Sequence, residues 1–129
     1  MMASSPKESP PAILIVDDDL GFLVWLGLTL SAGGFVTVPA TTGPQAEQLL
    51  ADLAIRINLA IVNLTLPRTA ELAGLLKRRN PLVKVIAIQT ASAGPALSIK
   101  TDGVHSRSRL GWITLVRKVL GIEKATGAR

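Results

Sequence analysis

Two predicted strand ends carry side chains that could bind a cation. The apolar run Ala12–Val16 is followed directly by the carboxylates of Asp17–Asp19, and the apolar run Leu59–Val62 is followed by Asn63. Adjacent carboxylates repel one another, so a cluster of this kind persists when a cation or a basic partner lies nearby. The three acids therefore predict a cation site, to which Asn63 offers an amide in place of a further carboxylate. The alternative is that all three acids are solvated caps, and Asp19 in particular is placed to cap a following helix.

Five short apolar runs alternate with helical patterns along the chain. Such alternation predicts an α/β fold, a single doubly wound parallel sheet with helices on both faces. The runs are almost continuously apolar, as is typical of strands covered on both sides. The predicted strands are Ala12–Val16, Phe35–Val38, Leu59–Val62, Val83–Ile88 and Gly103–Ser106. Helices are expected at Leu20–Ala32, from Pro44 onward, from an N-cap at Thr69 to Arg79, within Ala93–Lys100 and at Leu110–Leu120.

The strand ends also locate the candidate site. In doubly wound sheets, ligands bind beyond the carboxyl ends of the strands, where the strand order reverses. Asp17, Asp18, Asn63 and Gln89 all fall at such ends. Their coincidence at one edge of the predicted sheet is stronger evidence for a site than any one of them.

With these motifs in place, residues 12–121 resemble the receiver domain of bacterial response regulators. The resemblance implies a flavodoxin-like sheet of five strands in the order 2-1-3-4-5. In that family, two acids after the first strand and an aspartate after the third hold Mg²⁺, and that aspartate accepts a phosphoryl group. The resemblance places Asp17 and Asp18 at the acid pair, Asn63 at the acceptor, and Thr65 where a backbone carbonyl coordinates the metal.

Several positions depart from the family pattern. A carboxamide is a poor nucleophile that cannot form an acyl phosphate, and two carboxylates should bind Mg²⁺ more weakly than three. Gln89 stands at the position of a hydroxyl residue, unless a bulge restores Thr90 to it, and Val104 stands where an aromatic switch is expected. Arg107 replaces a lysine. It could pair permanently with Asp17 or Asp18 and supply the metal's charge, or it could be a solvated loop residue.

The first helix carries a second unusual feature, because it has no charged residue from Leu20 to Leu30. By helical spacing, one face holds Leu23, Leu26 and Leu30, which we assign to the core. Val24, Trp25 and Leu28 point roughly the opposite way. An exposed apolar patch around a tryptophan is a mark of an interface, so we expect a protein partner or a homodimer through this face. The alternative is that the N-terminal tail or a shifted helix covers it. Trp112 either extends the patch or packs locally.

Composition excludes several other classes of protein. The 129 residues predict one domain, residues 12–121, with flexible tails at 1–11 and 122–129. The absence of cysteine and of a signal-peptide pattern leads us to expect a cytoplasmic protein. The longest apolar stretch is about half of the roughly 20 residues that a membrane span needs. The net charge of +5 comes from scattered residues, so we do not expect specific nucleic-acid binding. His105 has no second histidine or cysteine to share a metal with and is expected to be structural.

These observations predict an atypical receiver-like module that signals by protein–protein interaction, with a signalling protein or histidine kinase as partner, and that is not an enzyme. One alternative is a working phosphoacceptor that uses Asp18, Asp19 or an aspartate formed by deamidation of Asn63. A basic nucleic-acid binder is the other.

Overall fold

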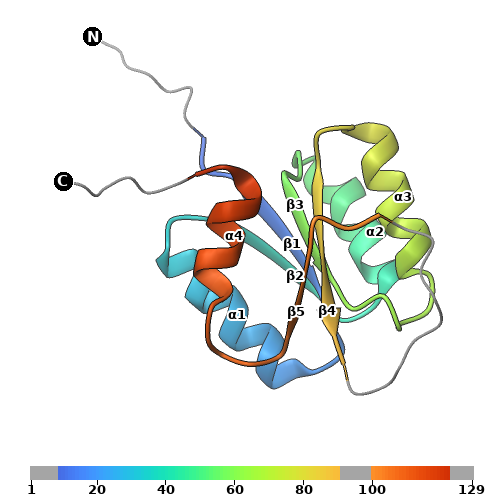
Figure 1. Ribbon diagram of the computed structural model, residues 1–129. Coiled ribbons are helices and arrows are strands. Elements are labelled where there is room, and N and C mark those ends of the chain that lie inside the picture. Colours follow the sequence, from blue (N-terminus) through green and yellow to red (C-terminus); the bar gives the residue numbers. More distant parts are fainter. Residues whose placement is uncertain (1–8, 91–99, 123–129) are drawn as a thin grey trace, which may run out of the picture.

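The computed structural model describes residues 9–90 and 100–122 and builds them around one parallel sheet (Figure 1). The strands are β1 (Ala12–Val16), β2 (Val36–Ala40), β3 (Leu59–Val62), β4 (Lys84–Gln89) and β5 (Gly103–Ser106). The helices are α1 (Leu20–Ala32), α2 (Gly43–Leu53), α3 (Thr69–Arg79) and α4 (Trp112–Leu120). The sheet order is β2-β1-β3-β4-β5, and every neighbouring pair is parallel. The predicted fold class and strand order are confirmed.

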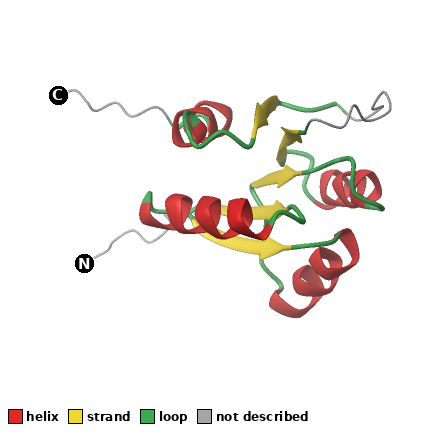
Figure 2. Ribbon diagram, turned by 90° about the horizontal axis from the view of Figure 1, so that it is seen from below, coloured by secondary structure: helices red, strands yellow, loops and turns green. Residues whose placement is uncertain are grey.

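The helices form two layers, with α1 and α4 on one face of the sheet and α2 and α3 on the other (Figures 1 and 2). Successive residues of a strand point to opposite faces. Leu14 and Val16 of β1 therefore pack in the α2–α3 layer, whereas Ile13 and Ile15 pack in the α1–α4 layer. All four side chains are fully buried, which explains why β1 reads as an unbroken apolar run.

Two predicted strands are displaced by a residue or two. The second strand runs from Val36 to Ala40, while Phe35 packs in the α1–α4 core. Pro39 is tolerated within it because β2 lies at the edge of the sheet. The fourth strand begins at Lys84 and ends at Gln89.

Three helix starts also differ from the prediction, and α2 begins one residue early, at Gly43. The predicted N-cap Thr69 is the first residue of α3, and Arg68 precedes it in the left-handed conformation. The last helix begins at Trp112 because Gly111 adopts a φ of 84°, which a right-handed helix does not accept. The helix expected within Ala93–Lys100 lies, except for Lys100, outside the described part of the chain. None of the described helices is both long enough and apolar enough to cross a membrane.

Candidate functional site

Pairing of β1 with β3 brings the two sequence motifs together. Val16 and Val62 are partners in register, so Asp17 and Asn63 leave the sheet side by side. The Asn63 backbone N–H donates to the Val16 carbonyl at 2.9 Å, and the Asp17 N–H donates to the Ala40 carbonyl of β2 at 3.1 Å. Both side chains are buried, at 0% exposure for Asp17 and 2% for Asn63. The site therefore lies where β1 is flanked by both neighbours, at the switch point of the sheet.

Asn63 is held by hydrogen bonds at both ends of its amide. Its Nδ2 donates to Asp17 Oδ1 at 3.1 Å. Its Oδ1 accepts from the Thr65 backbone N–H at 3.0 Å and from the Thr65 hydroxyl at 2.6 Å. The backbone N–H is only a donor, so it fixes which end of the amide is the oxygen. The amide oxygen thus points to the β3–α3 loop and the amide nitrogen to the carboxylate.

Arg107 closes the other side of Asp17. Its Nε donates to Oδ2 at 2.8 Å and its Nη2 donates to Oδ1 at 2.6 Å, a bidentate arrangement that suits a planar guanidinium. The same guanidinium lies 3.5 Å from Asp18 and 3.8 Å from Asp19. Of the two alternatives for Arg107, the structure has the pairing with the acid cluster, and Asp17 is the main partner. The repulsion among the three carboxylates is offset by this one cation.

Electrostatics keep this pair ionised. Burial acts to raise the pKa of Asp17, but hydrogen bonds from Arg107 and Asn63 and the positive charge of Arg107 outweigh it, so the pKa lies below its ordinary value of 3.8. The hydrogen bond to Asp17 raises the pKa of Arg107 in turn. Asp17 is therefore a carboxylate, and Arg107 a cation, throughout the neutral range.

The donor set in this arrangement does not fit Mg²⁺. Both oxygens of Asp17 accept from Arg107, and Oδ1 also accepts from Asn63. The Asn63 oxygen faces Thr65. Across residues 9–90 and 100–122, no group of three or more His, Cys, Asp or Glu side chains is placed to hold a metal. A Mg²⁺ ion would have to displace Arg107, so weak binding of Mg²⁺ stays a prediction.

The remaining predicted site residues are less deeply engaged. Asp18 has 62% of its side chain exposed. Asp19 caps α1, with Oδ1 accepting from the Phe22 N–H at 3.0 Å, so the cap interpretation holds for Asp19 but not for buried Asp17. Gln89 is exposed at the end of β4, with β3 between it and Asp17. Within the described chain no hydrogen bond joins Gln89 to Asp17, Asn63 or Arg107, so its inclusion in the site is not supported.

Sequence reasoning missed one supporting residue. The buried hydroxyl of Thr69 donates to the Leu66 carbonyl at 2.8 Å and lies 3.1 Å from the Asn63 carbonyl. It thereby ties the β3–α3 loop to the strand end that carries Asn63. The sequence pattern explained Thr69 as a helix N-cap, so its role in holding the β3–α3 loop was not predicted.

The outer face of α1 is apolar, as predicted, but its tryptophan is not at its centre. Leu20, Val24 and Leu28 are 62%, 58% and 67% exposed and follow one another at intervals of one turn. Trp25 is only partly exposed, because its ring lies 6.0 Å from that of Phe22 and the Arg109 guanidinium sits 5.2 Å above it. We name Leu20, Val24 and Leu28 the α1 stripe.

Trp112 packs locally instead of extending the α1 stripe. It is 1% exposed, its ring lies 5.8 Å from Phe22 and 4.5 Å from His105, and its Nε1 donates to the Ser106 carbonyl at 3.2 Å. His105 therefore has a packing role against this ring, as expected of a structural histidine.

A five-stranded parallel sheet in the order 2-1-3-4-5, covered on both faces and with polar groups at its switch point, defines a flavodoxin-like α/β protein. No protein-family model and no curated protein sequence matches the chain. Solved structures do match it, and those described next are receiver domains.

A CheY-like response regulator receiver domain protein from Methanospirillum hungatei aligns with a TM-score of 0.74 and 23% identity over 88% of this chain and 95% of its own. The receiver domain of an HD domain-containing protein from Pseudomonas fluorescens gives a TM-score of 0.70 and 22% identity, covering 93% of this chain and 92% of its own. The response regulator TrrA from Thermotoga maritima, solved in complex with Mg²⁺-BeF, gives 0.66 and 22%, with 88% and 99% covered. The chain therefore has the fold of a receiver domain over most of its length.

Proposed function

We propose that this chain is a receiver-like signalling module that acts by binding another protein and is not phosphorylated. The receiver fold supports the signalling role. One observation carries the rest: the network in which Arg107 and Asn63 both donate to Asp17. In this network the side chains at the position of a phosphoacceptor site are hydrogen-bonded to one another.

The chemistry of this network argues against phosphoryl transfer. An acyl phosphate needs a carboxylate oxygen as nucleophile, and the buried side chain beside Asp17 is an amide whose nitrogen is used as a donor. Phosphoryl transfer also depends on cations that neutralise the transferred group. Here the nearest cation is committed to Asp17 by two short hydrogen bonds. The polar side chains of the site are thus hydrogen-bonded to one another and not free to take part in a reaction. The proposed activity is therefore binding and not catalysis.

The α1 stripe supports a protein partner. Its three side chains are each more than half exposed and lie on one side of a helix whose opposite side is fully buried in the core. Burying a leucine or valine is worth about 1.5–3 kcal/mol, so three adjacent ones provide a useful anchor for an interface. The proposed partner is a signalling protein such as a histidine kinase, or a second copy of the chain.

Intact-mass spectrometry after incubation with a small acyl-phosphate donor and Mg²⁺ tests the proposal. We expect no phosphoryl adduct on protein verified to retain Asn63. The variant Asn63→Asp restores the carboxylate but leaves Arg107 on Asp17, so little adduct is expected. The double variant Asn63→Asp with Arg107→Lys should gain an adduct, because lysine cannot form the bidentate pair.

Two results would overturn the proposal. An adduct on the unmodified chain, mapped to Asp18 or Asp19, would mean that another carboxylate serves as nucleophile. Full adduct formation by Asn63→Asp alone would mean that Arg107 does not close the site. A receiver with an aspartate at the acceptor position serves as the positive control.

A further inference from the structure

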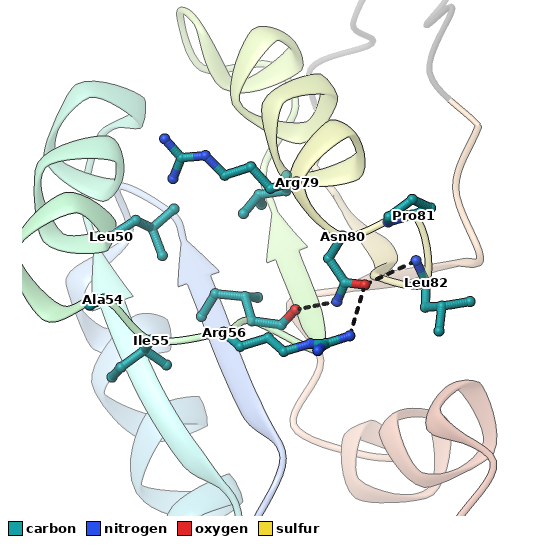
Figure 3. A pocket seen from close by; sticks show the side chains of 10 residues that line it. Leu50, Ala54, Ile55, Arg56, Arg79, Asn80, Pro81 and Leu82 are labelled. Carbon is teal, nitrogen blue, oxygen red and sulfur yellow. Dashed lines mark hydrogen bonds between the residues drawn. The ribbon is translucent and has the colours of Figure 1, made fainter.

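A cavity lies at the opposite end of the sheet from Asp17, where α2 and α3 both finish (Figure 3). Its volume is about 570 Å³, within the range of roughly 300–1,000 Å³ that is common for ligand pockets. Its floor consists of Leu50, Ile57 and Leu76, each at most 6% exposed. The cavity is distinct from the acid cluster and from the α1 stripe, so an inference drawn from it goes beyond the proposed function.

Two arginines border this cavity from different elements. In Figure 3, Arg79 extends from the end of α3 toward α2, and Arg56 extends from the α2–β3 loop toward Asn80. Both are exposed, and in the part of the chain that the structure describes neither forms a salt bridge. The lining includes no carboxylate. A pocket with an apolar floor, and with two guanidinium groups at its rim that have no carboxylate partner among the described residues, is complementary to a ligand that is both apolar and anionic.

Helix dipoles do not account for both arginines. Arg79 is the last residue of α3, where a cation is favoured by the partial negative charge of the helix end. Arg56 belongs to no helix. Each helix end carries about half a negative charge, so two full positive charges leave the mouth of the cavity net positive.

The cavity is held in shape by Asn80. Its Nδ2 donates to the Ile57 carbonyl at 3.2 Å, and its Oδ1 accepts from the Leu82 N–H at 3.2 Å and from Arg56 at 3.3 Å. These bonds join the end of α3 to the segment that enters β3. A pocket that is formed before binding does not have to be ordered by its ligand.

We propose that this cavity docks an acidic peptide segment of a partner protein, with one leucine-sized side chain on the apolar floor and flanking carboxylates on Arg56 and Arg79. An extended ligand is favoured because the lining includes an exposed apolar side chain in addition to the buried floor. Leu82, one of the lining residues, is 76% exposed.

Amide NMR of the whole chain tests this proposal, with the blocked peptide EDLDE as probe and its neutral counterpart QNLNQ as control. We expect EDLDE to shift the amide signals of residues 54–57, Asn80 and Leu82. The double variant Arg56→Gln with Arg79→Gln should weaken the affinity at least about tenfold, because two charge-assisted hydrogen bonds are lost. The control Arg78→Gln with Lys118→Gln removes the same charge outside the cavity and should weaken it less than about twofold.

Several outcomes would overturn it. No shift at about 5 mM EDLDE would exclude this class of ligand, since even weak contacts are detectable at that level. Equal weakening by both double variants would show general charge attraction, and equal affinity for QNLNQ would show a purely apolar pocket. A further outcome is that sedimentation of the protein alone shows a dimer that is lost in the double variant Arg56→Gln with Arg79→Gln. That result would mean that the cavity binds a second copy of the chain and not a peptide of another protein.

Discussion

At the scale of residues, the buried carboxylate of Asp17 is the key feature. A charge without exposure to water requires partners, because burying an unpaired ion costs several kcal/mol. Asp17 has two of them, Arg107 and Asn63, which come from positions 90 and 46 residues away in the chain. This pair and the amide form a structural unit, and its contribution to stability can be measured.

Removing Arg107 should destabilise the fold. We expect Arg107→Gln to lower the free energy of unfolding by about 1–3 kcal/mol, because Asp17 then loses its cationic partner while staying buried. Arg107 is itself 31% exposed, which limits the effect. Urea unfolding measures it as a lower midpoint at an unchanged slope. Arg78→Gln, on the exposed side of α3, is the control and should change the midpoint little.

The pH dependence of stability should carry the signature of Asp17. A carboxyl group whose pKa is lower in the folded state adds stability above its unfolded pKa, and this stability is lost as pH falls through the folded pKa. The unfolded value is near 3.8 and the folded value lies below it. The difference in free energy of unfolding between the native protein and Asp17→Asn should therefore be constant above about pH 5 and shrink below pH 3.8. A difference that shrank instead between pH 5 and 7 would contradict the assignment.

At the scale of elements, α1 is the most informative helix, because it is apolar on every side but buried on only one. Leu23, Leu26 and Leu30 are each 4% exposed or less, as their helical spacing predicts. Phe22 is also buried, and Trp25 leans toward it under Arg109. The exposed remainder is the narrow α1 stripe, so an interface there would be centred on aliphatic side chains.

Substitution of two leucines of α1 distinguishes the buried side of the helix, which stabilises the fold, from the exposed side, which is proposed to bind a partner. Leu26→Ala should lower the free energy of unfolding by about 2–5 kcal/mol, because it leaves a cavity in a fully buried site. Leu28→Ala should change it by about 0.5 kcal/mol or less, because that side chain is 67% exposed. Thermal or urea unfolding of the two variants makes the comparison within one helix. Similar losses in both would mean that the outer side of α1 is buried by something.

A charge on the α1 stripe should disrupt association without disrupting the fold. We expect Leu28→Glu to abolish self-association or partner binding through α1, since burying an unpaired carboxylate is costly. Analytical ultracentrifugation or a binding assay with a cognate kinase measures this. Val104→Glu, at an exposed valine on β5 outside both proposed binding surfaces, is the matched control. Equal losses in both variants would place the interface elsewhere.

At the scale of the whole molecule, the sheet separates two polar regions. Asn63 follows β3 and Ile57 precedes it, and six residues at about 3.3 Å each put roughly 20 Å between them. The acid cluster occupies one end of the strands and the arginine-bordered cavity the other. The α1 stripe lies on a third side. A single small domain thus presents three separate surfaces to its surroundings.

Substitutions at the two ends should act independently. The effects of Arg107→Gln and Arg79→Gln on the free energy of unfolding should add to within about 0.5 kcal/mol, because the two residues are far apart and share no partner. A double-mutant cycle by urea unfolding measures the coupling. A coupling above about 1 kcal/mol would show that the ends communicate through the sheet.

The sequence alone indicated the fold class, and it named Asp17, Asn63 and Thr65 as candidates for one site. The physical reason is that strand and helix periods, and the polar residues that end buried strands, are set by neighbours along the chain. The predicted strands β1, β3 and β5 match at both ends. Gln89 was assigned to the site by its place at a strand end, and the same rule could not tell that it is exposed there.

Only the tertiary structure decided which partner each polar group takes. The sequence left Arg107 a choice between two acids and the solvent, and the geometry of the loop after β5 directs it to Asp17. The sequence likewise left Trp25 exposed and Trp112 undecided, whereas packing in the α1–α4 layer covers the first and buries the second. The cavity between the ends of α2 and α3 had no sequence signal at all. Contacts of this kind join residues far apart in the chain, and they depend on how layers pack rather than on any local pattern.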